Sequence, residues 1–263
     1  MATAGKIIVL ITGANTGIGW ETAKALLQSK LRTYHILLGT RSVVKGEDAI
    51  AALRKDVPDT NSTIEALQVD VSNDDSINSA FAQVESTYGR VDSLINNAGI
   101  SLNVKLHRGE LSLRETWNQA YDVNVSGAHV MTHTFVPLLL KSADPRLIFI
   151  TSGLSTMQGM AKTYAPGAVP MPSGWPKPIT GMSSPDAYRA SKAALNMMML
   201  SWHWKLMQDG VKVWCLAFGD QEMLFQRGAG HPSIGGQLIT SVVEGQRDAD
   251  VGKVVSGDGI QPF

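Results

Sequence analysis

A tyrosine and a lysine lie four positions apart in the segment Tyr188-Arg189-Ala190-Ser191-Lys192. Residues at this spacing share one face of a helix, so the hydroxyl and the ammonium group can project into one pocket. A neighbouring cation stabilises a phenolate and lowers a tyrosine pKa from its free value of about 10, which makes the pair a workable general acid and base. The same spacing is common on helices, but Ser152 ends the preceding predicted strand, where doubly wound sheets bind their ligands.

Residues 12–19 contain three glycines. This segment directly follows the first apolar run and begins the first predicted helix. Glycine lets the backbone turn tightly and approach a pyrophosphate, and the free N–H groups of a helix N-terminus attract that anion. A tight strand–helix turn is the structural alternative, but the position of the loop at the start of the sheet favours a dinucleotide. The residues expected to contact the cofactor here are Gly13, Asn15, Thr16, Gly17, Ile18 and Gly19.

The end of the second predicted strand indicates which dinucleotide binds. An acidic residue there would bind the ribose hydroxyls of NAD, whereas an arginine accommodates the 2′-phosphate of NADP. The sequence reads Thr40-Arg41-Ser42, with no acid and a planar guanidinium suited to phosphate. We therefore predict NADP, with NAD as the alternative, and expect Thr40 and Arg41 to contact it.

Short aliphatic runs alternate with longer amphipathic segments along the chain, and the runs are continuously apolar. This pattern is typical of a parallel sheet covered on both faces. It predicts an α/β fold, one doubly wound Rossmann domain over residues 1–263 with a parallel sheet of about seven strands. The expected strands include residues 6–12, 35–39, 64–69, 91–95, 146–150 and 211–217, and the expected helices 20–28, 43–53, 74–88, 113–140 and 185–207, with a short helix from Pro232.

With these elements in place, the chain resembles the short-chain dehydrogenase/reductase family over nearly its whole length. Residues 12–19 match the TGxxxGxG loop, and Asn96-Asn97-Ala98-Gly99 matches the NNAG segment after the fourth strand. The Asn-Ser-Tyr-Lys tetrad of the family falls on Asn124, Ser152, Tyr188 and Lys192. The C-terminal part of the chain, from residues 228–230 through 248–251 and 259–263, is similar to fungal members of the family.

The resemblance implies a role for each matching residue. Ser152 would hold the substrate oxygen, Tyr188 would exchange the proton, and Lys192 would tune Tyr188 and bind the nicotinamide ribose, with Asn124 supporting a water path to Lys192. Asp70 and Val71 would receive the adenine, and Asn97, Ala98 and Gly99 would border the adenosine. From the residues alone, Asp70 has a second interpretation, as a cap of the helix beginning near Asn73.

Two departures from the family pattern concern the substrate side. Ser152 and Tyr188 are 36 positions apart, which is longer than usual, and residues 153–184 form a Pro/Gly-rich insert without helical periodicity. Such a loop is either part of the substrate rim or a solvated excursion. After the sixth strand, Phe218 stands where the family has proline, and the threonine that usually follows is absent. Proline has a fixed φ, so its replacement removes a backbone constraint beside the nicotinamide. As an alternative to full reductase activity, the sequence therefore predicts weak, altered or lost activity.

Composition excludes several classes of partner and cofactor. Lys+Arg and Asp+Glu number 23 each, so neither nucleic acid nor an anionic membrane is expected. No apolar run approaches the ~20 residues that cross a bilayer, so we expect a cytoplasmic protein. The single cysteine, Cys215, is expected to be a buried strand residue, and the scattered histidines, including His129 and His133, predict no metal site. Met197-Met198-Met199 with Trp202 and Trp204 predict a helix packed on the sheet or, if these residues are exposed, on a partner subunit. The resemblance implies oligomers formed through this helix and the one containing Asn124, so we expect a homo-oligomer.

The favoured hypothesis is an NADP(H)-dependent ketone or aldehyde reductase, or the reverse alcohol oxidation, acting on a small-molecule carbonyl or alcohol. A second hypothesis is a cofactor-binding protein that has lost turnover and serves as a sensor or binds a partner. A third keeps the Tyr188–Lys192 pair but uses bound cofactor for dehydration or epimerisation, without net consumption of NADPH.

Overall fold

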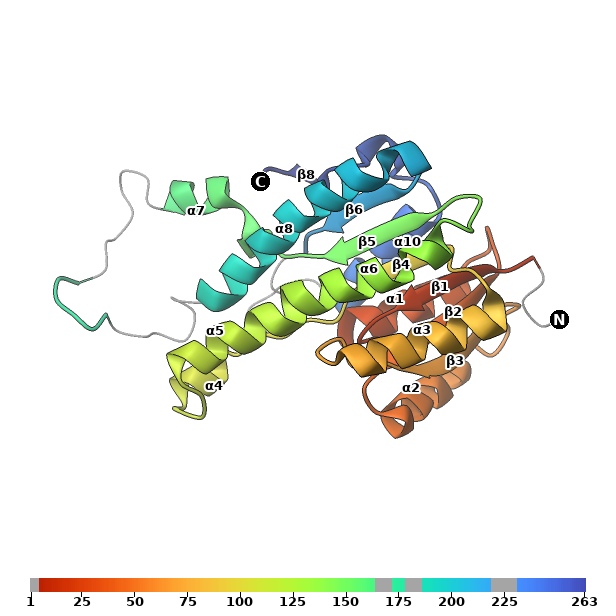
Figure 1. Ribbon diagram of the computed structural model, residues 1–263, viewed down its shortest axis with the longest axis horizontal. Coiled ribbons are helices and arrows are strands. Elements are labelled where there is room, and N and C mark those ends of the chain that lie inside the picture. The colour runs from red at the N-terminus through yellow and green to blue at the C-terminus, as the bar shows by residue number, and fades with distance from the viewer. Residues whose placement is uncertain (1–4, 164–171, 178–185, 219–230) are drawn as a thin grey trace.

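The described part of the chain in the computed structural model, residues 5–163, 172–177, 186–218 and 231–263, is built on an eight-stranded sheet of order β3-β2-β1-β4-β5-β6-β7-β8 (Figure 1). The strands are β1 (Ile7–Ile11), β2 (Tyr34–Thr40), β3 (Thr63–Gln68), β4 (Ser93–Asn96), β5 (Arg146–Ile150), β6 (Lys212–Leu216), β7 (Val254–Ser256) and β8 (Gly259–Gln261). The strands from β3 to β7 pair in parallel, whereas β8 is antiparallel to β7. The predicted doubly wound α/β sheet is confirmed, with β8 added at its edge.

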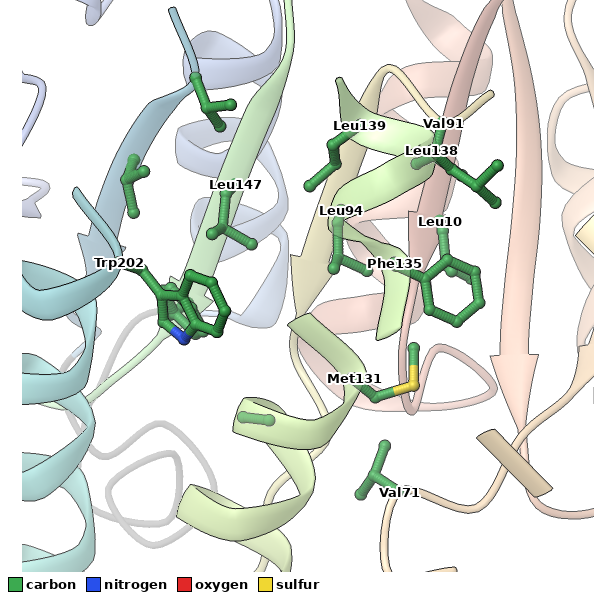
Figure 2. Close-up of a cluster of buried hydrophobic side chains, with 14 of the residues drawn as sticks. Leu10, Val71, Val91, Leu94, Met131, Phe135, Leu138, Leu139, Leu147 and Trp202 are labelled. Atoms are coloured by element: carbon green, nitrogen blue, oxygen red, sulfur yellow. The ribbon is translucent and has the colours of Figure 1, made fainter. Parts of the chain in front are cut away.

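Helices cover both faces of the sheet, as continuously apolar strands require. One face carries α1 (Gly17–Gln28), α2 (Val43–Asp56) and α10 (Pro232–Val243), and the other carries α3 (Asp74–Tyr88), α6 (Ala128–Leu139) and α8 (Asp186–Leu206). Successive strand residues point to opposite faces, so Leu10 joins one buried cluster and Ile11 the other. Figure 2 shows the first cluster, in which Phe135 of α6 packs with Leu10 and Leu94 of the sheet.

The single long helix predicted over residues 113–140 is divided into three parts. These are α5 (Leu113–Tyr121), a π-helical segment η1 (Asp122–Gly127) and α6. A capping box starts α5 where the sequence predicts, because Ser112 and Glu115 each accept a hydrogen bond from the other's backbone N–H. The π-helical turn widens the helix at Asn124, and such turns are frequent at functional sites.

The insert over residues 153–184 differs from the prediction at its start. A 3-10 turn, η2 (Gly153–Ser155), and a helix, α7 (Met157–Thr163), occupy a stretch where no helix was expected. Local hydrogen bonds explain the difference, since the Ser152 hydroxyl accepts from Leu154 N and the Thr156 hydroxyl from Gly159 N. Figure 1 shows α7 beyond the end of the sheet, on the side of β8. Residues 164–171 and 178–185 of the insert lie outside the described residues.

The shorter elements are α4 (Asn103–His107), η3 (Met207–Asp209) and η5 (Asp248–Asp250). Of the helices in the described ranges, none combines the length and apolar character needed to cross a bilayer.

Candidate active site

A cavity of about 640 Å³ opens at the carboxyl edge of the sheet, where β1 and β4 adjoin and the strand order reverses. Fourteen of the residues predicted for cofactor or catalysis line it: Gly13, Asn15, Thr16, Gly17, Ile18, Arg41, Asp70, Val71, Asn97, Ala98, Gly99, Ser152, Tyr188 and Lys192. The cavity therefore joins the glycine loop at one end to the tyrosine–lysine pair at the other. Gly19, Thr40 and Asn124 do not line it, and their places are described below.

The glycine loop is held open by its own backbone and by Asn97. Gly13 and Gly17 have φ of 62° and 61°, a region that favours glycine. The Asn97 amide donates to the carbonyls of Thr12 (2.9 Å) and Gly13 (3.1 Å), so it builds the loop as well as lining the cavity. Gly19 serves the same contact, because a Cβ there would lie 2.6 Å from the Asn97 side-chain nitrogen.

An anion could approach this loop closely. A Cβ on Gly17 would meet no other atom within 4 Å, so the space above the loop is open. Thr16, the residue before α1, makes no side-chain hydrogen bond to the first turn. The first N–H groups of α1 therefore point to open space and have the character of an anion site.

The end of β2 lies beside this loop. Thr40 is buried, and its hydroxyl donates to Asn15 Oδ1 (3.4 Å) and accepts from Ser42 N (3.3 Å). It thus shapes the turn that presents Arg41, whose exposed side chain lines the cavity. No acidic residue follows β2 before Glu47.

Asp70 lines the cavity and does not cap α3, so that alternative is wrong. The cap is Asn73, whose side chain accepts a hydrogen bond from Ser76 N (2.8 Å). Asp70 Oδ1 instead accepts from the backbone N–H (3.0 Å) and the hydroxyl (2.7 Å) of Ser72. The carboxylate is thereby fixed at the edge of the cavity.

Lys192 is buried beneath the cavity, directly against the end of β5. Its Nζ donates to the carbonyl of Ile150 (2.7 Å) and lies 5.8 Å from the centre of the Tyr188 ring. Burial lowers the pKa of Lys192 to about 8. A second hydrogen bond joins α8 to the residue after β5, since the Thr151 hydroxyl donates to the Lys192 carbonyl (3.1 Å). The lysine and the tyrosine thus share one pocket, as their spacing predicts.

Ser152 lies two residues after the end of β5. It is buried, lines the cavity with Tyr188 and Lys192, and its hydroxyl accepts a hydrogen bond from Leu154 N (3.1 Å). A hydroxyl held in this way keeps its proton available to donate to an oxygen in the cavity.

Asn124 lies behind the cavity wall. Its Oδ1 accepts from Ile100 N (2.8 Å), and its Nδ2 donates to the Ile100 carbonyl (3.0 Å) and to the Ser191 hydroxyl (2.9 Å). Gly99 separates it from the cavity, because a Cβ there would lie 3.2 Å from Asn124 Oδ1 and 3.1 Å from Lys192 Nζ. Asn124 therefore ties the segment after β4 to α8.

The cavity also has walls that sequence reasoning missed. They are Val69, Ser72, Ile100, Ser101, Gln119, Asp122, Val123, Ile150, Thr151 and Pro232. Most of these flank predicted residues, and Gln119, Asp122 and Val123 share one helical face at i, i+3 and i+4 just before Asn124, which was a usable signal. Pro232, the first residue of α10, had no local signal because only tertiary packing brings α10 onto α1.

The departure at Phe218 falls directly on the site. Phe218 is buried, lines the cavity, and its carbonyl accepts a hydrogen bond from Gly153 N (2.8 Å). Residues 219–224, where the family threonine is missing, lie outside the described residues.

The predictions for cysteine and histidine concern neighbouring packing. Cys215 is buried in β6, as predicted. His129 Nδ1 accepts a hydrogen bond from the Trp202 indole N–H (3.2 Å), which is a packing contact. In the described ranges, no three His, Cys, Asp or Glu residues gather in a way that could hold a metal ion.

Comparison with known proteins identifies the family. The model of the short chain dehydrogenase family matches residues 7–165. The chain is 50% identical to the short-chain dehydrogenase/reductase tropE of Talaromyces stipitatus and 43% identical to eupG of a Phoma species, with all of both chains covered in each case.

Solved structures show the same fold. A short-chain dehydrogenase/reductase from Burkholderia xenovorans superposes with a TM-score of 0.73 at 24% identity, covering 96% of each chain. A metagenomic short-chain oxidoreductase solved in complex with NADP gives 0.64 at 24% identity, covering 90% of each chain.

Proposed function

The chain belongs to the short-chain dehydrogenase/reductase family, and from this premise we propose that it is an NADP(H)-dependent oxidoreductase that interconverts a carbonyl and an alcohol. The observation that carries the proposal is that one cavity joins the glycine loop and Arg41 to Ser152, Tyr188 and Lys192. A cavity of about 640 Å³ is within the range of cofactor and ligand pockets.

The residues present suit a nicotinamide dinucleotide. The open space above Gly17 and the uncapped N-terminus of α1 suit its pyrophosphate, and Asp70 suits the adenine amino group. The remaining adenosine and phosphate contacts would come from Gly13, Asn15, Thr16, Ile18, Val71, Asn97, Ala98 and Gly99. Gly19 and Thr40 would support these residues from behind. The absence of an acid after β2 and the presence of Arg41 favour NADP over NAD, and the NADP complex of a structural neighbour agrees with this choice.

The bound cofactor would supply the hydride. Tyr188 gives its hydroxyl proton to the substrate oxygen in reduction and takes it back in oxidation, while Ser152 donates a hydrogen bond that holds the same oxygen. Lys192 favours the phenolate form of Tyr188 and holds the nicotinamide ribose. Asn124 supports a water path to Lys192 from behind the cavity wall.

Replacing Arg41 by alanine tests the choice of dinucleotide. We expect the Kd for NADPH to rise about tenfold, because a charge-assisted hydrogen bond to phosphate is lost, while the Kd for NADH stays unchanged. Nucleotide fluorescence titration measures both constants. The matched control is Arg54→Ala, at the far end of α2, where the guanidinium contacts the Ile64 carbonyl. Equal weakening of both nucleotides by Arg41→Ala would contradict the assignment to the 2′-phosphate.

A second candidate function follows from Phe218. A bulky residue in place of the family proline at the cavity wall favours a protein that binds the cofactor without turnover. Saturable NADPH binding without NADPH consumption across a broad panel of ketones and aldehydes would support this alternative. Product formation without net NADPH consumption would instead support dehydration or epimerisation.

We also propose that the protein forms a homo-oligomer through α8. Met199 and Trp202 are buried in the core, but Met197 and Trp204 are 69% and 76% exposed. These two residues are seven positions apart, so they lie on one stripe of the helix. Apolar side chains of this size, gathered on one exposed stripe, are typical of an interface.

The double substitution Met197→Glu and Trp204→Glu should convert the oligomer to monomers. Two carboxylates per protomer would be desolvated in the interface, at a cost that association cannot offset. Light scattering coupled to size-exclusion chromatography reports the mass. Leu31→Glu, at a residue that is 69% exposed after α1, is the control and should leave the mass unchanged. A monomeric wild-type protein would refute the proposal.

A further inference from the structure

The chain between Ser152 and Tyr188 does not by itself fix the distance between them. These residues are 36 positions apart, and they lie on two different elements, the turn after β5 and the helix α8. Effective proton transfer requires both hydroxyls to reach one substrate oxygen, with an error well below 1 Å. Contacts across the fold must therefore set their separation.

One such contact centres on the hydroxyl of Ser155, three residues after Ser152. It donates to the Ser152 carbonyl (2.6 Å) and accepts from the side-chain amide of Asn196 (2.9 Å). Asn196 is four positions after Lys192 and eight after Tyr188, so all three lie on one face of α8. Ser152, Ser155 and Asn196 are each buried, and the network thus links the Ser152 turn to the catalytic helix away from solvent.

The same hydroxyl receives a second donor from the far end of the chain. Gln261 Nε2 donates to Ser155 Oγ (3.2 Å) and to the Ser152 carbonyl (3.3 Å). The Ser155 hydroxyl therefore has one donated and two accepted bonds, which is its full capacity. Gln261 completes the set of donors around the backbone of Ser152.

The strand β8 determines where Gln261 lies. It pairs antiparallel with β7, with Gln261 opposite Val254, and β7 in turn pairs with β6 in the main sheet. Beyond the strand, the carbonyl of Phe263 accepts from Gln158 N (3.4 Å) and from the Thr156 hydroxyl (3.5 Å). The segment from Gln261 to Phe263 thus contacts the turn at four positions between Ser152 and Gln158.

We infer that Gln261, acting through Ser155 and together with Asn196, is a positioning residue that sets Ser152 against Tyr188. This inference rests on the proposed function, in which Ser152 and Tyr188 share the substrate oxygen. The antiparallel strand β8 was not predicted. By this inference it carries Gln261, which supports the Ser152 hydroxyl by fixing the backbone of Ser152. The cofactor end of the cavity lies outside this network, so cofactor affinity should not depend on Gln261.

The test is Gln261→Met, which keeps the length of the side chain and removes the amide donor. We expect kcat for carbonyl reduction to fall about tenfold, because displacements of about 1 Å can cost up to about a hundredfold. KM for NADPH should remain within twofold of the wild-type value. The matched control is Gln246→Met, since Gln246 is exposed and its side-chain amide donates to Glu244, away from the Ser152 turn, and it should leave kcat unchanged. Asn196→Ala should lower kcat in the same way from the other side of Ser155.

Hydrogen–deuterium exchange provides a readout independent of activity. In Gln261→Met, the amides of residues 152–158 should exchange faster, while those of β1 and α1 keep their wild-type rates. A wild-type kcat in Gln261→Met overturns the positioning role, whether or not exchange increases, and leaves the proposed function intact. A lower kcat with unchanged exchange also overturns it, because Gln261 would then act by another route. A wild-type protein without turnover refutes the proposed function, and if Gln261→Met then exchanges residues 152–158 at the wild-type rate, the contact is refuted as well.

Discussion

Replacement of Tyr188 by phenylalanine is expected to lower kcat for carbonyl reduction by about 10²–10⁴-fold, the usual contribution of a general acid. The substitution removes one oxygen atom and keeps the ring that lines the cavity beside Lys192. NADPH consumption followed by absorbance, with the best substrate of a ketone and aldehyde panel, measures the loss.

The affinity for NADPH separates a chemical role from a structural one. Because the phosphate and adenosine contacts lie at the other end of the cavity, Tyr188→Phe should bind NADPH with a Kd within about threefold of the wild-type value, equivalent to less than 1 kcal/mol. The matched control is Tyr121→Phe, where the ring stacks on Trp117 and does not line the cavity. A Tyr188→Phe protein that turns over at the wild-type rate would show that another group provides the proton.

Replacement of Gly127 by alanine is expected to damage both stability and activity. A Cβ at this position would overlap the carbonyl oxygen of Val71 and lie 3.0 Å from its carbonyl carbon. Backbone atoms cannot rotate away as a side chain does, so the helix or the segment after β3 must shift. Overpacking of this kind costs about 1–3 kcal/mol of unfolding free energy. Urea denaturation followed by circular dichroism measures the change.

The position of Gly127 explains why activity should fall as well. It ends the π-helical segment that contains Asn124, and its neighbour Val71 lines the cavity. A shift there moves Asn124 relative to Ile100 and Ser191, its hydrogen-bond partners. Gly257→Ala is the control, because a Cβ there meets no atom within 4 Å, and its stability should change by less than about 0.5 kcal/mol. A Gly127→Ala protein as stable as the wild type would mean that this close approach does not exist in solution.

The layered fold and the identity of most cavity residues could be predicted from the sequence, because these depend on local patterns. Continuous apolar runs define parallel strands, and β5 occupies residues 146–150 as predicted. A glycine loop between a strand and a helix leads to the carboxyl edge of the sheet, and the spacing of Tyr188 and Lys192 is set by one helix. The NADP specificity, the assigned catalytic roles and the part played by residues 153–184 stay predictions.

Features that depend on contacts between distant residues could not be predicted from local patterns. Asn124 donates a hydrogen bond to Ser191, 67 positions away, and Gln261 donates one to the Ser152 carbonyl, 109 positions away. No local sequence pattern predicts either hydrogen bond. The π-helical turn after α5 gave no signal either, because residues 113–140 have the apolar period of one continuous helix. Helix α7, whose first turn donates to the Thr156 hydroxyl, was missed because the stretch that follows it is rich in proline and glycine. The periodicity of apolar residues indicates which face of a helix or strand is buried. The hydrogen bonds that align one catalytic group with another form only once the whole sheet is assembled.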